Sequence, residues 1–105
     1  DANTGFGAGA NAGVARALER GCDAVVLLNP DLRVDAPTVV ALAEEVRRRP
    51  DTLVAPRITR PDGTPWFTGA VVDRAAGWTR NLPDLPEGER DAWLTGACLA
   101  VSATL

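Results

Sequence analysis

A short, unbroken apolar run, AVVLLN, occupies Ala24–Asn29 and leaves few folds open to this chain. The run is too short for a helix and is β-branched at its start, which is typical of a strand that is covered on both faces. A strand covered in this way needs helices on both sides of its sheet, and helical sequence both precedes and follows this run. The order of segments therefore predicts an α/β domain with a mainly parallel sheet flanked by helices.

The remaining segments alternate between helical and extended patterns. Residues 10–20 carry apolar side chains at helical spacing, and Gly21 follows as a C-terminal stop. Asp35 can cap a second helix, which Pro50 ends. Further strands are expected at residues 52–58, 65–73 and 92–102, with a polar loop at 77–91. Because a βα unit does not begin with its helix, we expect the 105 residues to be an interior piece of one larger domain.

Composition excludes several classes of function. The chain has 11 Lys and Arg against 14 Asp and Glu and no basic block, so nucleic acid is not an expected partner. It has no histidine, and its two cysteines, Cys22 and Cys98, lie far apart in sequence, which argues against a zinc site. Both are expected to be reduced core thiols in a cytoplasmic protein. No apolar run approaches the roughly 18 residues of a membrane span.

A glycine-dense run, NTGFGAGANAG, spans residues 3–13 just before the first expected helix. Glycines at the start of a helix leave backbone N–H groups accessible to an anion such as a diphosphate. The run also fits a flexible loop followed by a tightly packed helix start. A third interpretation is the dinucleotide fingerprint G-x-G-x-x-A, formed by Gly5, Gly7 and Ala10 with Asp31 as the ribose-binding acid, which predicts an NAD-binding oxidoreductase module.

Four segments taken together resemble the family 2 glycosyltransferases, particularly the rhamnosyltransferase-like branch. They are NTGFGAGANAGVARAL, VVLLNPDLRV, VAPRI followed by PDG, and WLTGACLAV. The resemblance spans residues 3–101 apart from the loop at 77–91. The resemblance implies a Rossmann-like GT-A domain, of which residues 1–105 would be a fragment. The N-terminal base-binding strand and helix and the C-terminal segment with the general base would then lie outside it.

The resemblance also implies an activity. Such enzymes transfer a sugar, usually with inversion, from a nucleotide diphosphate sugar to a glycan or a lipid-linked saccharide in cell-surface polysaccharide and cell wall synthesis. A Mg²⁺ or Mn²⁺ ion assists the reaction. The parent protein would work in the cytoplasm at the inner face of the membrane. Because its general base would lie beyond Leu105, the isolated chain is predicted to be inactive.

Particular residues acquire roles from the same resemblance. Asp31 matches the second aspartate of the family's D-x-D loop and would contact the metal, while Asn29 stands in place of the first. The nucleotide-sugar side would be lined by Asn3, Gly5, Phe6, Gly9, Asn11, Asn29 and Asp31. The acceptor side would be lined by Trp93, Thr95, Gly96 and Ala97.

Three of these residues also have a purely structural interpretation. Asp31 follows a proline, as turn residues often do, and Phe6 and Trp93 are of types that commonly pack in a core. A non-catalytic protein that keeps the scaffold as an interaction surface would carry the same sequence. Such a protein would bind no nucleotide, and replacing Asp31 would not affect it.

Overall fold

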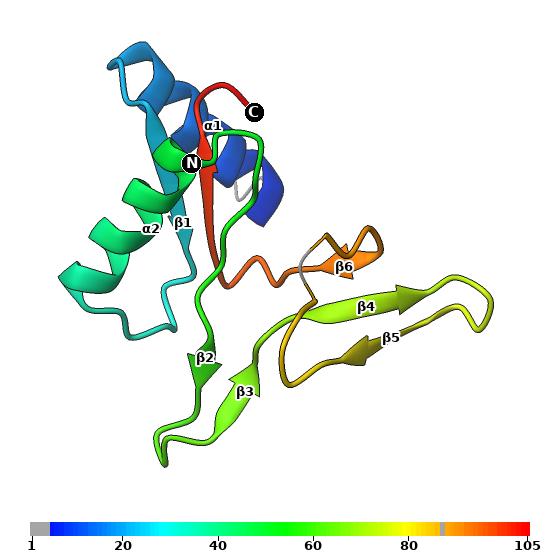
Figure 1. The fold of residues 1–105 in the computed structure, drawn as a ribbon. Coiled ribbons are helices and arrows are strands. Elements are labelled where there is room, and N and C mark those ends of the chain that lie inside the picture. The colour runs from blue at the N-terminus through cyan, green and yellow to red at the C-terminus, as the bar shows by residue number, and fades with distance from the viewer. Residues whose placement is uncertain (1–4, 87) are drawn as a thin grey trace.

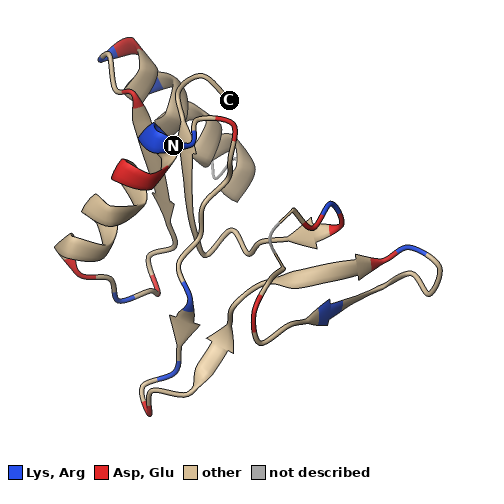
Figure 2. Ribbon diagram, in the orientation of Figure 1, with Lys and Arg blue, Asp and Glu red and all other residues tan. Residues whose placement is uncertain are grey.

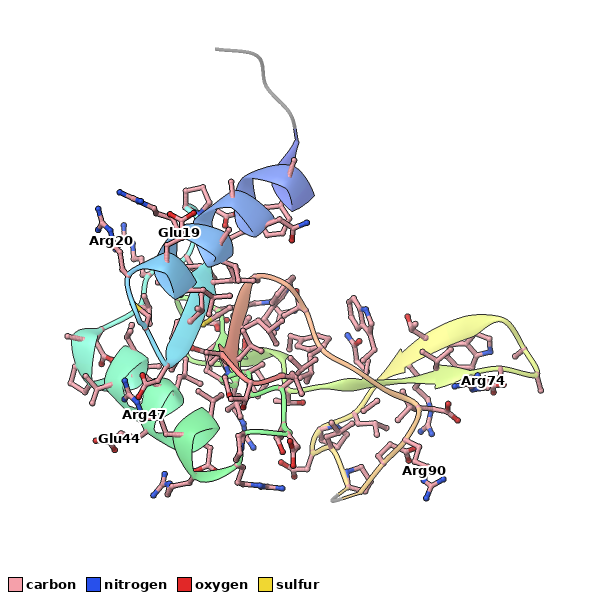
Figure 3. All side chains as sticks on the ribbon, turned by 90° about the horizontal axis from the view of Figure 1, so that it is seen from above. Glu19, Arg20, Glu44, Arg47, Arg74 and Arg90 are labelled. Atoms are coloured by element: carbon pink, nitrogen blue, oxygen red, sulfur yellow. The ribbon has the colours of Figure 1, made fainter. Side chains whose placement is uncertain are left out.

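The computed structural model describes residues 5–86 and 88–105, which form a small mixed α/β fold (Figure 1). In chain order the elements are α1 (Phe6–Glu19), β1 (Ala24–Leu28), α2 (Ala36–Arg48), β2 (Ile58–Thr59), β3 (Pro65–Phe67), β4 (Ala70–Asp73), β5 (Trp78–Asn81), β6 (Ala92–Trp93) and β7 (Cys98–Ser102). Helices α1 and α2 lie on opposite sides of the β1–β7 pair (Figure 3), and the β2–β3 and β4–β5 hairpins project from one end of it (Figure 1).

The strand pairs among the described residues are antiparallel, so the prediction of a mainly parallel GT-A-like sheet is wrong. Strand β1 pairs with β7 in a register that runs from Ala24 opposite Ser102 to Leu28 opposite Cys98. On the other side of β7, an antiparallel bridge joins Val54 to Ala100. The hairpins lie at the end of the β1–β7 pair where β1 ends (Figure 1), so the chain comes back to the pair at that end. The chain therefore re-enters as β7 in the reverse direction, whereas a parallel strand would need a crossover back to the other end.

The core lies between α2 and one face of the β1–β7 pair. Leu42 and Val46 of α2 pack with Cys98 and Ala100 of β7, and all four are buried. Cys98 is thus the core thiol that was predicted, but Cys22 is exposed. The prediction that the 24–29 run is buried on both faces is wrong. The residues of β1 are half-buried or exposed, and α1 contributes no buried residue to cover them.

Two polar contacts hold α2 in place. At its N-terminus the Asp35 carboxylate accepts a hydrogen bond of 2.9 Å from the Thr38 N–H, which confirms the predicted cap. Near its C-terminus Arg47, labelled in Figure 3, donates two hydrogen bonds of 2.8 and 2.9 Å to Asp23, just before β1. Hydrogen bonding from the Arg47 side chain lowers the pKa of Asp23. This bidentate pair joins the end of α2 to the start of β1.

We expect Asp35→Ala to lower the melting temperature, because it removes the cap of the helix that supplies Leu42 and Val46 to the core. Asp35→Asn is the matched control, since asparagine also caps helices and should melt near the wild type. Hydrogen bonding from the side chain and the backbone N–H of Thr38 lowers the pKa of Asp35. The charged cap therefore stabilises the fold above pH ~4, and this contribution is lost as the pH falls through the folded-state pKa. Thermal melts of both variants between acidic and neutral pH would test this, and identical melts for all three proteins would contradict it.

The predicted element boundaries fail mainly at proline and glycine. Helix α1 begins at Phe6 rather than at residue 10. Gly7, Ala8 and Gly9, which were expected to precede the helix, therefore lie inside it. The strand expected at 52–58 is reduced to the bridge at Val54 and to β2, since Pro56 has no N–H to donate to a ladder.

Three further segments differ from the sequence prediction. The single strand expected at 65–73 divides into β3 and β4 at Gly69, which has φ +137° and whose Cβ position would lie 3.1 Å from Leu85 Cβ. The strand expected at 92–102 divides into β6 and β7. The expected loop at 77–91 contains β5, which pairs with β4. Strands β3 and β5 pair within local hairpins, while β6 and β7 pair with β4 and β1, which are more distant in the sequence.

Candidate functional site

Two of the predicted motifs meet at the end of the β1–β7 pair. The Asn29 N–H, directly after β1, donates a hydrogen bond of 2.9 Å to the Ala97 carbonyl, directly before β7. The Ala97 N–H in turn donates to the Thr95 hydroxyl oxygen over 3.3 Å. The Asn29-Pro30-Asp31 turn and the Thr95–Ala97 segment, which are widely separated in the sequence, are therefore neighbours in the fold.

The N-terminus of α1 reaches the same place. A Cβ atom on Gly96 would lie 3.9 Å from Cε1 of Phe6, the first residue of the helix. The Phe6 side chain is 61% exposed, so it is a surface residue rather than part of the core. Gly5 is the N-cap of α1, and Gly9 and Asn11 are exposed further along it. Asn3 lies outside the described residues.

The glycine run does not form an open loop within the described residues. Gly7, Gly9 and Gly13 lie inside α1, and a Cβ atom added to any of them would meet nothing within 4 Å. The described part of the chain therefore gives no packing reason for these glycines. A close approach by a ligand to Gly9, as predicted from the sequence, remains compatible with this open surface.

We expect Gly9→Ala and Gly13→Ala each to stabilise the protein by about 0.5–1 kcal/mol, because alanine replaces glycine in an exposed helix interior. If a nucleotide sugar contacts Gly9, Gly9→Ala should weaken nucleotide binding, while Gly13→Ala, one turn further from Phe6, should leave it unchanged. Urea unfolding gives the stability and an amide NMR titration gives the binding. Equal binding by the two variants would argue against contact at Gly9.

Asp31 lies at the surface where the turn after β1 opens into a groove. The Leu32 N–H donates to the Asn29 carbonyl over 3.2 Å, which closes the turn and leaves the Asp31 side chain exposed. The groove has a volume of about 760 Å³ and lies between residues 31–35 and 56–61. Cys98 also lines it, and burial raises the pKa of this thiol.

The residues around Asp31 fit a metal that arrives with a phosphate ligand. In the part of the chain that the structure describes, no three His, Cys, Asp or Glu side chains gather closely enough to hold a metal ion. Asp31 would therefore act as a single carboxylate, with the Asn29 amide two residues before it. Mg²⁺ is commonly held by one or two carboxylates together with substrate phosphates and water. The oxygen atoms of Asp31 and Asn29 suit a Mg²⁺ ion that is also bound by phosphate. They are too few to surround an ion with protein ligands alone.

Trp93 does not take part in the contact between Asn29 and Ala97, because it lies in the ladder between β4 and β6. It pairs with Ala70, and its ring meets Phe67 edge to face at a centroid distance of 5.2 Å. Half of its surface is still accessible, at 45% exposure. The packing interpretation of Trp93 thus has direct support, while Thr95, Gly96 and Ala97 lie with Asn29.

Three arginines that line the groove were not predicted as site residues from the sequence. Arg33 follows the Asn29–Asp31 turn, and Arg57 and Arg60 flank β2. No spacing in the sequence indicates that residues 31–35 and 56–61 line the same groove. Their proximity depends on the path of residues 49–57, which pass beside β7 at the Val54–Ala100 bridge. A basic residue two positions after a candidate metal carboxylate was the one local hint.

No protein family, curated protein or solved structure matches this chain. Among the described residues, no helix combines the length and the apolar character needed to cross a membrane.

Proposed function

We propose that this chain is part of a metal-assisted, inverting glycosyltransferase resembling family 2. It would transfer a sugar from a nucleotide diphosphate sugar to a saccharide acceptor. The observation that carries the proposal is the hydrogen bond from the Asn29 N–H to the Ala97 carbonyl. It joins the Asn29-Pro30-Asp31 turn, which resembles the D-x-D loop, to the Thr95–Ala97 segment. The position of Phe6 beside Gly96 adds the N-terminus of α1 to the same cluster.

The exposed groups of the cluster suit the chemistry of sugar transfer. A bound Mg²⁺ or Mn²⁺ would neutralise the charge that develops on the leaving diphosphate. Asp31 would bind that ion, and the Asn29 amide can hydrogen-bond a sugar or ribose hydroxyl. The exposed ring of Phe6 offers an apolar wall against which a sugar or base can pack.

An amide NMR titration of the full chain with UDP and with dTDP tests the proposal, because it detects weak binding. With Mg²⁺ present, we expect shifts at the amides of Phe6, Asn29 and Asp31. Removing the metal with EDTA should weaken binding by about tenfold or more, since the metal links the carboxylate to the diphosphate.

NAD is the comparison ligand in this experiment. Metal-independent binding of NAD at the N-terminus of α1 would contradict the proposal and favour an oxidoreductase module. No shifts with any nucleotide would favour a non-catalytic scaffold.

A further inference from the structure

The outer edge of β1 has no strand beside it in the part of the chain that the structure describes. Strand β1 pairs with β7 on one side, and no described strand pairs with it on the other. All its side chains are apolar, and Figure 2 shows no charged position along it. It contains no proline, and its register with β7 is unbroken. A regular edge without charge or proline is a template for pairing with another strand.

The hydrogen bonds at the two ends of β1 show which of its backbone groups face this edge. The Asn29 N–H donates to the Ala97 carbonyl over 2.9 Å, and the Ala103 N–H donates to the Asp23 carbonyl over 2.9 Å. Because antiparallel strands bond at every second residue, alternate residues of β1 direct their N–H and C=O groups away from β7. These outward residues are Ala24, Val26 and Leu28. Their backbone groups can therefore pair with a further strand.

The opposite edge of the β1–β7 pair is used in this way within the chain. Ala100 of β7, directly opposite Val26, donates to the Val54 carbonyl over 2.7 Å and accepts from the Val54 N–H over 3.1 Å. The corresponding groups of Val26 face the open edge. Val26 is also the central residue of the five in β1, so an identical strand centred there can pair along all of β1.

Helix α2 presents an uncharged stripe beside the same edge. Its members recur at helical spacing and are Ala36, Val40 and Ala43. Val40 is 55% exposed. Arg47 continues the stripe by one turn and reaches Asp23, just before β1 (Figure 3). The stripe therefore lies on the side of α2 that is next to β1.

The spacing of strands and helices suits a second copy at this edge. Helix α2 contacts both β1 and β7, so in a sheet that continues from β1 into a second β1 the two α2 axes lie two strands, or about 10 Å, apart. Packed helices lie at about this distance. Val26 lies about 10 Å along β1 from Asp23, which is the length of about seven helix residues, so Val40 is level with Val26. A two-fold axis at Val26 thus brings the two Val40 side chains together.

Charge favours the same antiparallel arrangement. The charged positions of α2 lie at its start and toward its end (Figure 2), outside the stripe from residue 36 to residue 43. Arg47 and Asp23 neutralise each other within one copy. In an antiparallel pair, the N-cap Asp35 of one α2 lies toward the last turn of the other, which carries Arg47 and Arg48. The opposite ends of the two helix dipoles also lie together.

We propose that two copies of this chain associate through β1, antiparallel about a two-fold axis at Val26. The two pairs form one sheet in the order β7-β1-β1-β7, with both α2 helices on one face. On the other face, the α1 helices can approach closely, because a Cβ atom on Gly7, Gly9 or Gly13 would meet nothing within 4 Å. The contact is small, so we expect a Kd of about 10 µM or higher and a monomer in more dilute solution.

Analytical ultracentrifugation of the full chain from about 1 to about 500 µM tests the proposal. We expect a shift from monomer to dimer and no larger species, because a two-fold contact closes on itself. Val40→Lys should raise the Kd by about tenfold or more, because like charges then meet at the axis. An equal mixture of Val40→Lys and Val40→Glu should recover the dimer, since unlike charges then meet. Leu53→Lys is the matched control, because Leu53 is 47% exposed and lies beside the Val54 bridge, on the β7 side.

Amide hydrogen exchange measured by NMR tests the register of the pairing. Exchange at the Val26 N–H should slow as the concentration rises through the Kd, because this group becomes hydrogen-bonded in the dimer. The Val25 N–H faces β7 already and should change little. Equal slowing at both residues, or at neither, would contradict pairing through the outer edge of β1.

A monomer at every concentration would overturn the proposal and leave the β1 edge to a strand of other origin. Species larger than a dimer would overturn it in favour of non-specific association of strand edges. An equal effect of Val40→Lys and Leu53→Lys, or no recovery in the mixture, would place the contact elsewhere. Because Val40 is exposed, circular dichroism of Val40→Lys in dilute solution should match the wild type, which separates loss of the dimer from loss of the fold.

Discussion

Replacing Asp31 with alanine is expected to weaken metal-dependent binding of a nucleotide diphosphate by about tenfold or more. Asp31 is the carboxylate that the turn after β1 presents beside the Asn29–Ala97 contact. A metal shared between one carboxylate and a diphosphate loses its protein anchor when that carboxylate is removed. The melting temperature should stay the same, because Asp31 is exposed and forms no ion pair with a described residue. An amide NMR titration in Mg²⁺ gives the affinity, and a thermal melt gives the stability.

Asp51→Ala is the matched control for this experiment. Asp51 is another exposed aspartate next to a proline, but it follows α2 and does not line the groove. It should bind the nucleotide as the wild type does. If Asp31→Ala also binds as the wild type, Asp31 is a turn residue only and the metal assignment is wrong.

The substitution Val46→Ala is expected to destabilise the fold by about 2 kcal/mol, from the lost burial of two methyl groups and the cavity left behind. Val46 has no exposed surface and packs in the cluster with Leu42, Cys98 and Ala100. Val40→Ala is the control on the same helix. Because Val40 is 55% exposed, its loss should change the free energy of unfolding by less than about 0.5 kcal/mol. Urea unfolding measures both, and similar losses for the two variants would show that the core does not lie between α2 and β7.

Local chemistry made parts of the fold predictable. Asp35, with Pro37 in the first turn of the helix, marks the start of α2, and Gly21, at φ +76°, follows the end of α1. Strand β1 was predicted within one residue, since a short β-branched run bounded by turns has few alternatives. These features depend on residues within a few positions of one another, where capping and backbone preference decide.

The candidate site was predictable only in part. The residues of the Asn29–Asp31 turn and of the Thr95–Ala97 segment were chosen from sequence, and the fold places Asn29 against Ala97. Trp93 was assigned to the same side, yet its ring packs on Phe67. The arginines of the groove carried no motif at all.

The amino-acid sequence by itself determined where α2 begins, where α1 ends and which residues form β1, because caps, stops and apolar runs act over a few neighbouring residues. Only the tertiary structure decided that β7 runs antiparallel to β1. It also decided that Arg33 faces Arg57 and Arg60 across one groove. These outcomes depend on contacts between segments far apart in the chain, where burial and strand pairing outweigh local preference.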